Sequence, residues 1–213
     1  MTCLYRAARF AAWAGFKLLG RTRVIGLEHI PSEGGVIVAC NHVSYLDPPL
    51  VGSNIPRECA FMARHDLWNT RFLGWLISRL NAFPVHRDAA DRKALRAAVD
   101  VLKQGLVLVL FPEGTRSPDG QLHEAQPGFA LIVQMSQVPV VPCAVNGPEV
   151  MLPLHSRLIR PAQLTVVFGN PVFFTPDEPR EEILRVIMGS IAGLLNQYRP
   201  ALPPGDLYPA ITD

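Results

Sequence analysis

Residues 35–48 read GVIVACNHVSYLDP, an apolar run followed at once by a polar segment with a histidine and an aspartate. Residues 35–40 have the composition of a strand buried on both faces, because no polar side chain interrupts the run. Apolar patterning along the rest of the chain predicts further strands at residues 23–30, 58–63, 82–86, 106–111, 138–145 and 164–168. The first of these alternates weakly and is expected at a sheet edge.

Helical spacing of apolar residues separates these strands. It predicts helices at residues 4–20, 69–80, 88–103, 128–137 and 179–198, with Asp88 as the cap of the third. Apolar strands that alternate with helices predict an α/β fold with a mostly parallel mixed sheet flanked by helices. We expect an N-terminal helix over residues 1–22, one domain over 23–199 and a proline-rich, loose tail over 200–213.

The amino-acid composition excludes some classes of protein. Twenty Lys and Arg against 18 Asp and Glu leave a net charge of +2, which excludes a nucleic-acid binder that works by bulk charge. Hydrophobic residues make up 49% of the chain and charged residues 18%, which excludes disorder and suggests contact with an apolar partner. The four cysteines have no C-x-x-C spacing, so we expect no zinc site. Cys40 and Cys143 lie inside apolar runs, so we expect buried reduced thiols in a reducing cytoplasm, with a disulfide pair as the alternative.

The N-terminal helix carries a cationic stripe. On a helical wheel its positive charges share a face with two aromatic residues, namely Arg6, Arg9, Lys17 and Arg21 with Phe10 and Trp13. The opposite face, Ala8, Ala11, Gly15, Leu18 and Leu19, is expected to pack on the protein. This pattern suits the lipid headgroup region, although a solvated basic face would look the same. The longest apolar run, residues 10–16, is too short to span a bilayer, so we expect peripheral attachment to the cytoplasmic face of the cell membrane.

A histidine and an aspartate stand five residues apart in the polar segment. They cannot share one face of a straight helix, but a tight turn can bring His42 and Asp47 together. An aspartate that accepts a hydrogen bond from one imidazole nitrogen leaves the other nitrogen free as a base. In the alternative, Asp47 only caps a helix that begins at Pro48, and His42 is an ordinary turn residue.

Residues 111–117 read FPEGTRS and form a second candidate site. Gly114 permits an unusual backbone, and Arg116 with the hydroxyls of Thr115 and Ser117 could bind a phosphate. A plain surface turn is the alternative. In FPVHR (83–87), Arg87 stands beside a helix start and offers a second anion contact. Ser44 and Ser117 lack the setting of a serine nucleophile.

These polar segments each follow an apolar strand directly. In an open α/β sheet, ligands bind outside the carboxyl ends of the strands. If the strands run mostly parallel, residues 41–47, 87–88 and 113–116 therefore converge on one cleft.

The combination resembles the glycerolipid acyltransferases of the PlsC-like, lysophosphatidic acid acyltransferase family. NHVSYLD (41–47) and FPEGTRS (111–117) match two blocks of that family, and FPVHR (83–87) and VPVVPCAVNG (138–147) resemble the other two, in the same order. The resemblance implies transfer of an acyl group from acyl-CoA or acyl-carrier protein to the hydroxyl of a lyso-lipid such as 1-acylglycerol-3-phosphate. It implies His42 as the general base and Asp47 as the residue that orients it.

The resemblance also assigns the acceptor site. It places Arg87, Glu113, Gly114 and Arg116 around the acceptor phosphate, with Thr115 and Ser117 in the same loop. It implies no metal and no cofactor beyond the donor thioester. Many family members carry a lysine in a K-x-G stretch after this loop, whereas residues 125–128 here read AQPG. A thioesterase, an acyltransferase for another lyso-acceptor and a non-catalytic lipid-binding module are the alternatives.

Overall fold

Seven strands form one sheet in the computed structural model, in the order β1-β7-β6-β2-β5-β3-β4. Their bounds are β1 Arg23–Ile25, β2 Val36–Cys40, β3 Cys59–Arg64, β4 Ala82–Val85, β5 Val107–Leu110, β6 Val140–Asn146 and β7 Thr165–Phe168. The structure describes residues 1–86, 91–154, 156 and 158–198. Neighbouring strands run parallel, except that β6 and β7 are antiparallel. The predicted α/β fold with a mostly parallel sheet is therefore confirmed.

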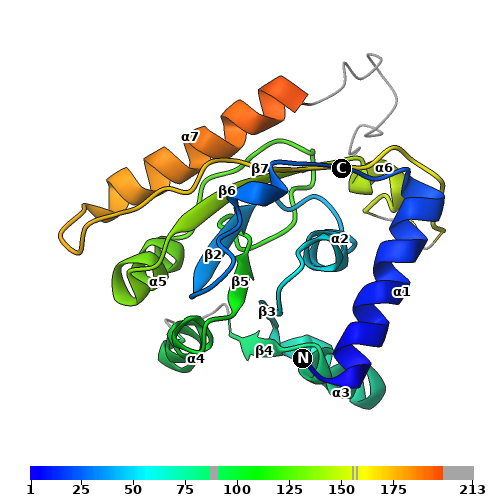
Figure 1. Cartoon of the computed structure of the whole chain (residues 1–213), viewed down its shortest axis with the longest axis horizontal. Coiled ribbons are helices and arrows are strands. Elements are labelled where there is room, and N and C mark those ends of the chain that lie inside the picture. The colour runs from blue at the N-terminus through cyan, green and yellow to red at the C-terminus, as the bar shows by residue number, and fades with distance from the viewer. Residues whose placement is uncertain (87–90, 155, 157, 199–213) are drawn as a thin grey trace, which may run out of the picture.

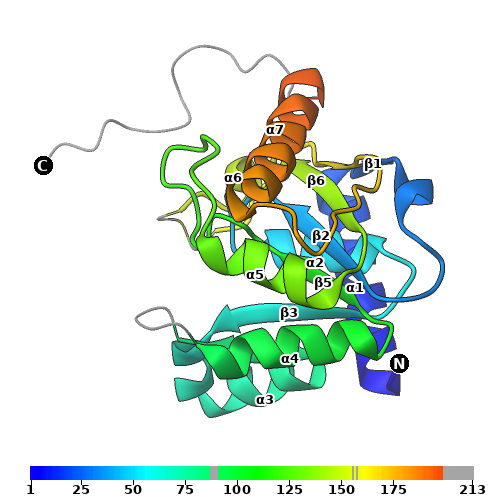
Figure 2. The same cartoon turned by 90° about the vertical axis from the view of Figure 1, so that its left-hand side faces the viewer.

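Helices cover both faces of this sheet (Figures 1 and 2). The α-helices are α1 Cys3–Gly20, α2 Asp47–Asn54, α3 Arg71–Arg79, α4 Arg92–Lys103, α5 Pro127–Ser136, α6 Pro148–Met151 and α7 Arg180–Tyr198, with short 3-10 helices η1 Leu27–His29 and η2 His65–Asn69. Helices α1 and α2 lie on one face, and α4, α5 and α7 lie on the other. The predicted cap Asp88 and the tail over 200–213 fall outside the described residues, and Asp91 caps α4 instead.

Strand β2 explains why the sheet needs both layers. All five of its residues are buried. Val36, Val38 and Cys40 point into the core beneath α1 and α2, and Ile37 and Ala39 point into the core beneath α4, α5 and α7. A strand that is apolar on both faces is stable only between two apolar layers.

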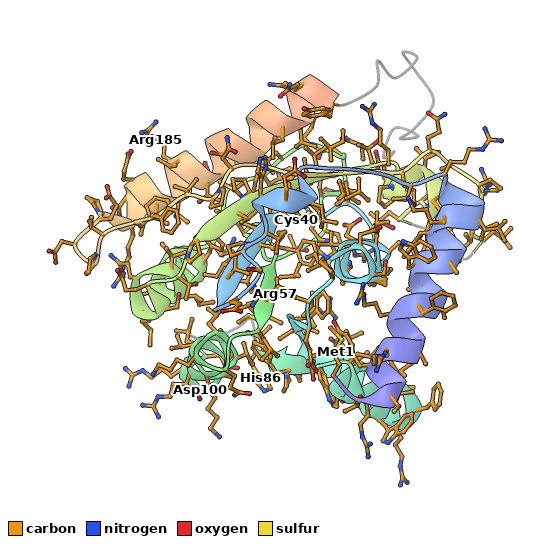
Figure 3. The ribbon with its side chains drawn as sticks, viewed as in Figure 1. Met1, Cys40, Arg57, His86, Asp100 and Arg185 are labelled. Atoms are coloured by element: carbon orange, nitrogen blue, oxygen red, sulfur yellow. The ribbon has the colours of Figure 1, made fainter. Side chains whose placement is uncertain are left out.

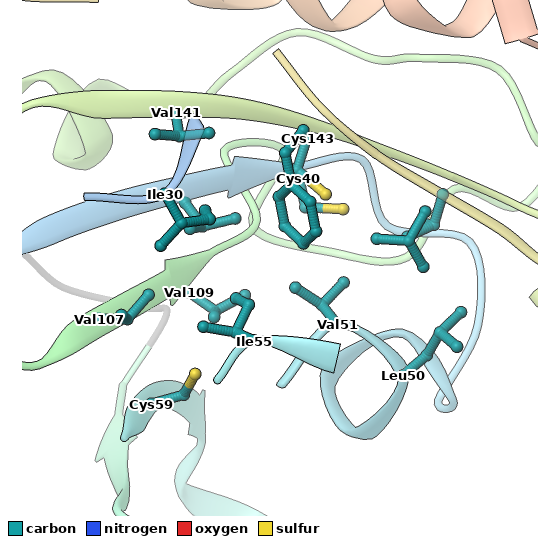
Figure 4. Close-up of a cluster of buried hydrophobic side chains, with 14 of the residues drawn as sticks. Ile30, Cys40, Leu50, Val51, Ile55, Cys59, Val107, Val109, Val141 and Cys143 are labelled. Atoms are coloured by element: carbon teal, nitrogen blue, oxygen red, sulfur yellow. The ribbon is translucent and has the colours of Figure 1, made fainter. Parts of the chain in front are cut away.

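Cys40 and Cys143 face each other across β2 and β6, within the core drawn in Figure 4. Both thiols are buried and free, and burial raises the pKa of Cys40 well above its usual value. The predicted burial of this pair is confirmed. Cys59 is also buried and free, whereas Cys3 is exposed.

Arg57, labelled in Figure 3, stabilises the amino-terminal edge of the sheet by hydrogen bonds to backbone carbonyls. Its guanidinium donates to the carbonyl oxygens of Pro31 and Gly105, each at 2.6 Å, and also to that of Gly34. These carbonyls belong to the segments that lead into β2 and β5. The two strands that carry the main polar segments are thus held at the edge opposite to those segments.

The structure corrects the predicted packing face of α1. Its buried or partly buried side is formed by Tyr5, Arg9, Ala12 and Phe16, whereas Leu18 is 83% exposed. The wheel placed Arg9 with the lipid-facing residues, but its Nε donates to the carbonyl of Ser53 on α2 at 3.3 Å. The wheel gives relative directions only, and the position of α2 decides which side is covered. No helix among the described residues is long and apolar enough to span a bilayer.

Candidate active site

The loop after β2 is tied to β6 by Asn41. Its side-chain nitrogen donates to the Val145 carbonyl at 3.1 Å, and its side-chain oxygen accepts from the Val145 amide at 2.8 Å. This two-way contact continues the sheet pairing with a side chain, because the backbone leaves the strand here. The next residue, His42, therefore starts from a fixed position at the carboxyl end of β2.

His42 and Asp47 form the pair that the spacing predicted. Imidazole Nδ1 lies 2.7 Å from Asp47 Oδ2, and the aspartate side chain is fully buried. The same oxygen accepts from the backbone amides of Val43 at 2.7 Å and Ser44 at 2.8 Å. Because this oxygen is an acceptor for both amides, Nδ1 is the donor to it, and in the neutral imidazole Nε2 then keeps its lone pair.

The predicted capping role of Asp47 is wrong. Asp47 is the first residue of α2, and the helix shows no side-chain cap. Its carboxylate turns back to the preceding loop instead of toward the amides of the first turn. Pro48 does stand in the first turn, as predicted. The aspartate is thus committed to the histidine and to the turn that holds it.

The ring of Phe111 packs against the imidazole of His42. The two rings stack with centroids 4.1 Å apart and an angle of 25° between their planes. The ring restricts rotation of the imidazole and keeps water from one of its faces. The motif at residues 111–117 gave no indication of this contact, because His42 and Phe111 are far apart in the sequence.

Glu113 braces two loops. Its Oε1 accepts from the His42 amide at 3.0 Å, and its Oε2 accepts from the His123 amide at 3.0 Å. The Ser117 amide donates to the His42 carbonyl at 2.7 Å, which adds a second link between the loops. Burial raises the pKa of Glu113, and the two backbone donors partly offset this effect. In this structure the carboxylate positions His42, and its place in an acceptor site stays a prediction.

Arg116 lies over the ring of Tyr45, with its guanidinium carbon 3.5 Å from the ring centre. Tyr45 belongs to the His42 loop and is 61% exposed, so the contact holds the cation on the open side of that loop. Gly114 and Thr115 are exposed, and Gly114 has φ +71°, which favours glycine. The cation predicted for an anion thus lies beside the loop that carries the candidate base.

Ser117 and Arg87 are the remaining residues that were predicted to bind the substrate. Ser117 is buried, and its hydroxyl donates to Asp119 at 2.9 Å. Asp119 also contacts His123, and these hydrogen bonds, with the amide of Gln121 as the main donor, lower its pKa to about 2. Arg87 lies outside the described residues, so its contact with an anion stays a prediction. Strand β4 ends at Val85, at the same edge as β3 and β5.

Two hollows flank this region. A cavity of about 670 Å³ lies beyond β6, near Arg21, Arg23 and Asn146, and His42 does not line it. A smaller apolar groove of about 90 Å³ lies between α1 and α2, and Pro48, the residue after Asp47, is part of its lining, whereas His42 is not. No cluster of His, Cys, Asp or Glu within the described part of the chain could hold a metal ion.

Comparisons with known proteins agree with this geometry. A family model described as "Acyltransferase" matches residues 21–146. The 1-acyl-sn-glycerol-3-phosphate acyltransferase of Bacillus subtilis is 28% identical over 79% of this chain and 82% of its own length. That of Cocos nucifera is 32% identical over 79% of this chain but 55% of its own length. The solved structure of PlsC, the 1-acyl-sn-glycerophosphate (LPA) acyltransferase of Thermotoga maritima, has a TM-score of 0.79 at 26% identity, over 92% of this chain and 80% of that one.

Proposed function

Because the chain belongs to the acyltransferase family, we propose that it moves a fatty acyl group from a thioester donor, acyl-CoA or acyl-carrier protein, to the hydroxyl of a lyso-lipid. The proposed acceptor is 1-acylglycerol-3-phosphate, which would give phosphatidate. The observation that carries this proposal is the hydrogen bond between His42 Nδ1 and Asp47 Oδ2 at 2.7 Å. It supports a base whose Nε2 is free to take a proton.

In the proposed reaction, Nε2 of His42 accepts the proton of the acceptor hydroxyl while the oxygen attacks the thioester carbonyl. Asp47 stabilises the imidazolium that forms, as the aspartate of a catalytic triad does. The tetrahedral intermediate then collapses, the carbon–sulfur bond breaks, and the imidazolium returns the proton to the leaving thiolate. The thioester is already activated, so the step needs no covalent enzyme intermediate.

The apolar groove supports an acyl substrate. Its lining includes Ala8 and Ala12 of α1, Gly52 of α2 and Phe61 of β3, together with Pro48, the residue after Asp47. We propose this groove as the place for part of the alkyl chain of a substrate. Apolar lining contributes binding energy in proportion to the area that it buries.

Transfer and hydrolysis are separated by one experiment. Acyl-CoA labelled in the acyl chain is incubated with the protein and a panel of lyso-lipids, and the label is followed into lipid and into free acid. We expect label in lipid. Label in free acid alone would instead support a thioesterase in which the same pair activates water, and label in neither product would contradict both activities.

Arg116→Ala should lower kcat/KM for the acceptor. A charged hydrogen bond to a phosphate is worth roughly 1.5–3 kcal/mol, which corresponds to a loss of about 10- to 150-fold. The KM for the donor should stay unchanged, because the proposed partner of Arg116 is the acceptor headgroup. Steady-state kinetics with each substrate varied in turn measure both effects. Arg96→Ala, an exposed arginine of α4, is the control, and an unchanged acceptor kcat/KM for Arg116→Ala would refute the phosphate role.

Gln126→Lys should shift the acceptor preference toward lysophosphatidate. The amide of Gln126 closes the 111–117 loop by donating to Pro112 at 2.8 Å, and a Cβ on Gly114 would lie 2.9 Å from Gln126 Cγ. A cation here would therefore stand beside the proposed phosphate site. A phosphate monoester carries more negative charge than a diester and gains more from that cation.

The same measurement tests the wild-type protein. We expect kcat/KM for lysophosphatidate to exceed that for lysophospholipids with larger headgroups by less than about a hundredfold, because one cation fewer contacts the monoester. Gln104→Lys, at the opposite edge of the sheet, adds the same charge as a control. A larger preference in the wild type, or no shift with Gln126→Lys, would show that this position does not select the acceptor.

We also propose that α1 attaches the protein to the cytoplasmic face of the cell membrane. Phe10 is 66% exposed, Trp13 40% and Leu18 83%, and Lys17 is exposed beside them. Deleting α1 would disturb the fold, because Tyr5 and Phe16 are buried. Phe10→Gln with Leu18→Gln should instead reduce sedimentation with anionic vesicles and preserve the melting temperature. Equal sedimentation of the variant and the wild type would contradict the role of α1.

A further inference from the structure

Most of the large apolar side chains exposed in the described residues lie on or near α1 and α3. They are Phe10, Trp13, Leu18 and Leu19 of α1, Phe72 and Trp75 of α3, and Leu158 and Ile159. The last two belong to a segment that meets the end of α1, where the Ala162 amide donates to the Leu19 carbonyl at 3.3 Å. By contrast, α4 exposes charged residues, Arg92, Lys93, Arg96, Asp100 and Lys103.

Helix α3 exposes an aromatic pair between two cations. Phe72 is 71% exposed, Trp75 is 49% exposed, and their ring centroids are 6.1 Å apart. The Arg79 guanidinium lies 5.6 Å from the centre of the Trp75 ring, and Arg71 begins the helix. The helix contains no acidic residue. Aromatic rings next to Lys or Arg side chains on one helix are typical of helices that lie in the interface of a membrane.

The opposite side of α3 is fixed to the protein. Gly74 is buried, and a Cβ at this position would lie 3.0 Å from the Cα of Trp68. Trp68 in turn donates from its indole nitrogen to Ser78 at 2.8 Å. The pair Phe72 and Trp75 therefore faces solvent while the helix itself is held in place.

Helices α1 and α3 border the same groove. Tyr5 and Ala8 of α1 line it together with Leu80, the residue that follows α3. In Figure 1, α1 runs down the right-hand flank and α3 lies at its lower end, away from α5 and α7. A surface that held the exposed side of α1 would therefore lie close to α3.

We propose that α3 is a second membrane contact, at which Phe72 and Trp75 enter the interface of an anionic bilayer and Arg71 and Arg79 bind lipid phosphates. The choice of a bilayer as the partner rests on the proposed function, whose acceptor is a membrane lipid. The charge also agrees, because both helices carry basic residues and no acidic ones. Anionic lipid attracts such segments. Two helices at one interface fix the orientation of the protein, which a single helix does not.

The test uses the full chain and vesicles of phosphatidylcholine with and without phosphatidylglycerol. We expect Phe72→Gln with Trp75→Gln to weaken sedimentation with the anionic vesicles by about tenfold, given the apolar area of two rings. Met135→Gln with Phe173→Gln removes two exposed apolar side chains outside this flank and should bind as the wild type does. Equal binding of the α3 variant and the wild type, or no binding by the wild type, would overturn the proposal.

Trp75 itself supplies a second readout. The chain has three tryptophans, and Trp13→Phe with Trp68→Phe leaves Trp75 alone. Its emission should shift to the blue on anionic vesicles and be quenched by brominated lipid. If Trp75 emission does not shift in a protein that sediments with the vesicles, the proposal is overturned.

An activity measurement separates membrane binding from catalysis. With a water-soluble short-chain acceptor, the α3 variant should have the same kcat as the wild type, and a lower kcat would assign α3 to the catalytic fold instead. Failure of acyl transfer by the wild type would contradict the proposed function and leave the vesicle result standing.

Discussion

His42→Ala should lower kcat by at least about 10²–10⁴-fold, the usual contribution of general-base catalysis. The imidazole is the group that accepts the hydroxyl proton in the proposed reaction. His42 lies in a turn with its side chain 15% exposed, so its removal should leave the fold intact. Transfer of labelled acyl groups measures the rate, and circular dichroism measures the fold.

The matched control is His123→Ala. His123 lies on a neighbouring loop, and its side chain is 46% exposed and paired with Asp119. This variant should keep an activity of the same order as the wild type. A residual activity of His42→Ala above about a tenth of the wild type would contradict the assignment of His42 as the general base, because a general base contributes far more than tenfold to kcat.

Asp47→Asn should lower kcat by about 10²–10⁴-fold with a smaller effect on the KM of either substrate. An amide can still accept the Val43 and Ser44 amides through its oxygen, so the turn can persist. The same oxygen then faces Nδ1 of His42, but it belongs to a neutral amide and no longer stabilises an imidazolium with a negative charge.

Asp47→Ala provides the comparison for stability. It removes the acceptor of two buried amides, and each unsatisfied buried group costs about 1–3 kcal/mol. Thermal melting should therefore fall for Asp47→Ala more than for Asp47→Asn, while both variants lose kcat. Asp100→Asn, an exposed aspartate of α4, is the control for the charge change. An Asp47→Asn variant with wild-type kcat would show that the aspartate has a structural role alone.

Glu113 illustrates a role that the motif alone did not reveal. The sequence placed its carboxylate near an acceptor phosphate, where two negative groups would repel each other. In the structure the carboxylate is 3% exposed, and both of its oxygens accept backbone amides. From the loop after β5, it holds the His42 loop, which follows the neighbouring strand β2, and the backbone at His123. A sequence pattern does not predict such a buried carboxylate that holds two loops together, because its partners are backbone amides, which every residue except proline has.

Local sequence determined the order and type of most elements. The strand over residues 35–40 was predictable because an uninterrupted apolar run is stable only when both faces are covered. The edge at which the polar segments meet followed from parallel strands, since their carboxyl ends share one edge of the sheet. The spacing of His42 and Asp47 indicated a turn that could bring them together. Each of these inferences depends on neighbours within a few residues.

Tertiary structure decided what depends on distant parts of the chain. Strand β7 runs antiparallel to β6, and α1 packs through Tyr5 and Phe16 instead of through Leu18 and Leu19. The carboxylate of Asp47 turns back to its loop, and Phe111 stacks on His42 although 69 positions separate them. Periodicity gives directions around a helix or along a strand, but the side that becomes buried depends on which element packs there. That choice is made by the free energy of the whole core, to which residues far apart in the sequence contribute together.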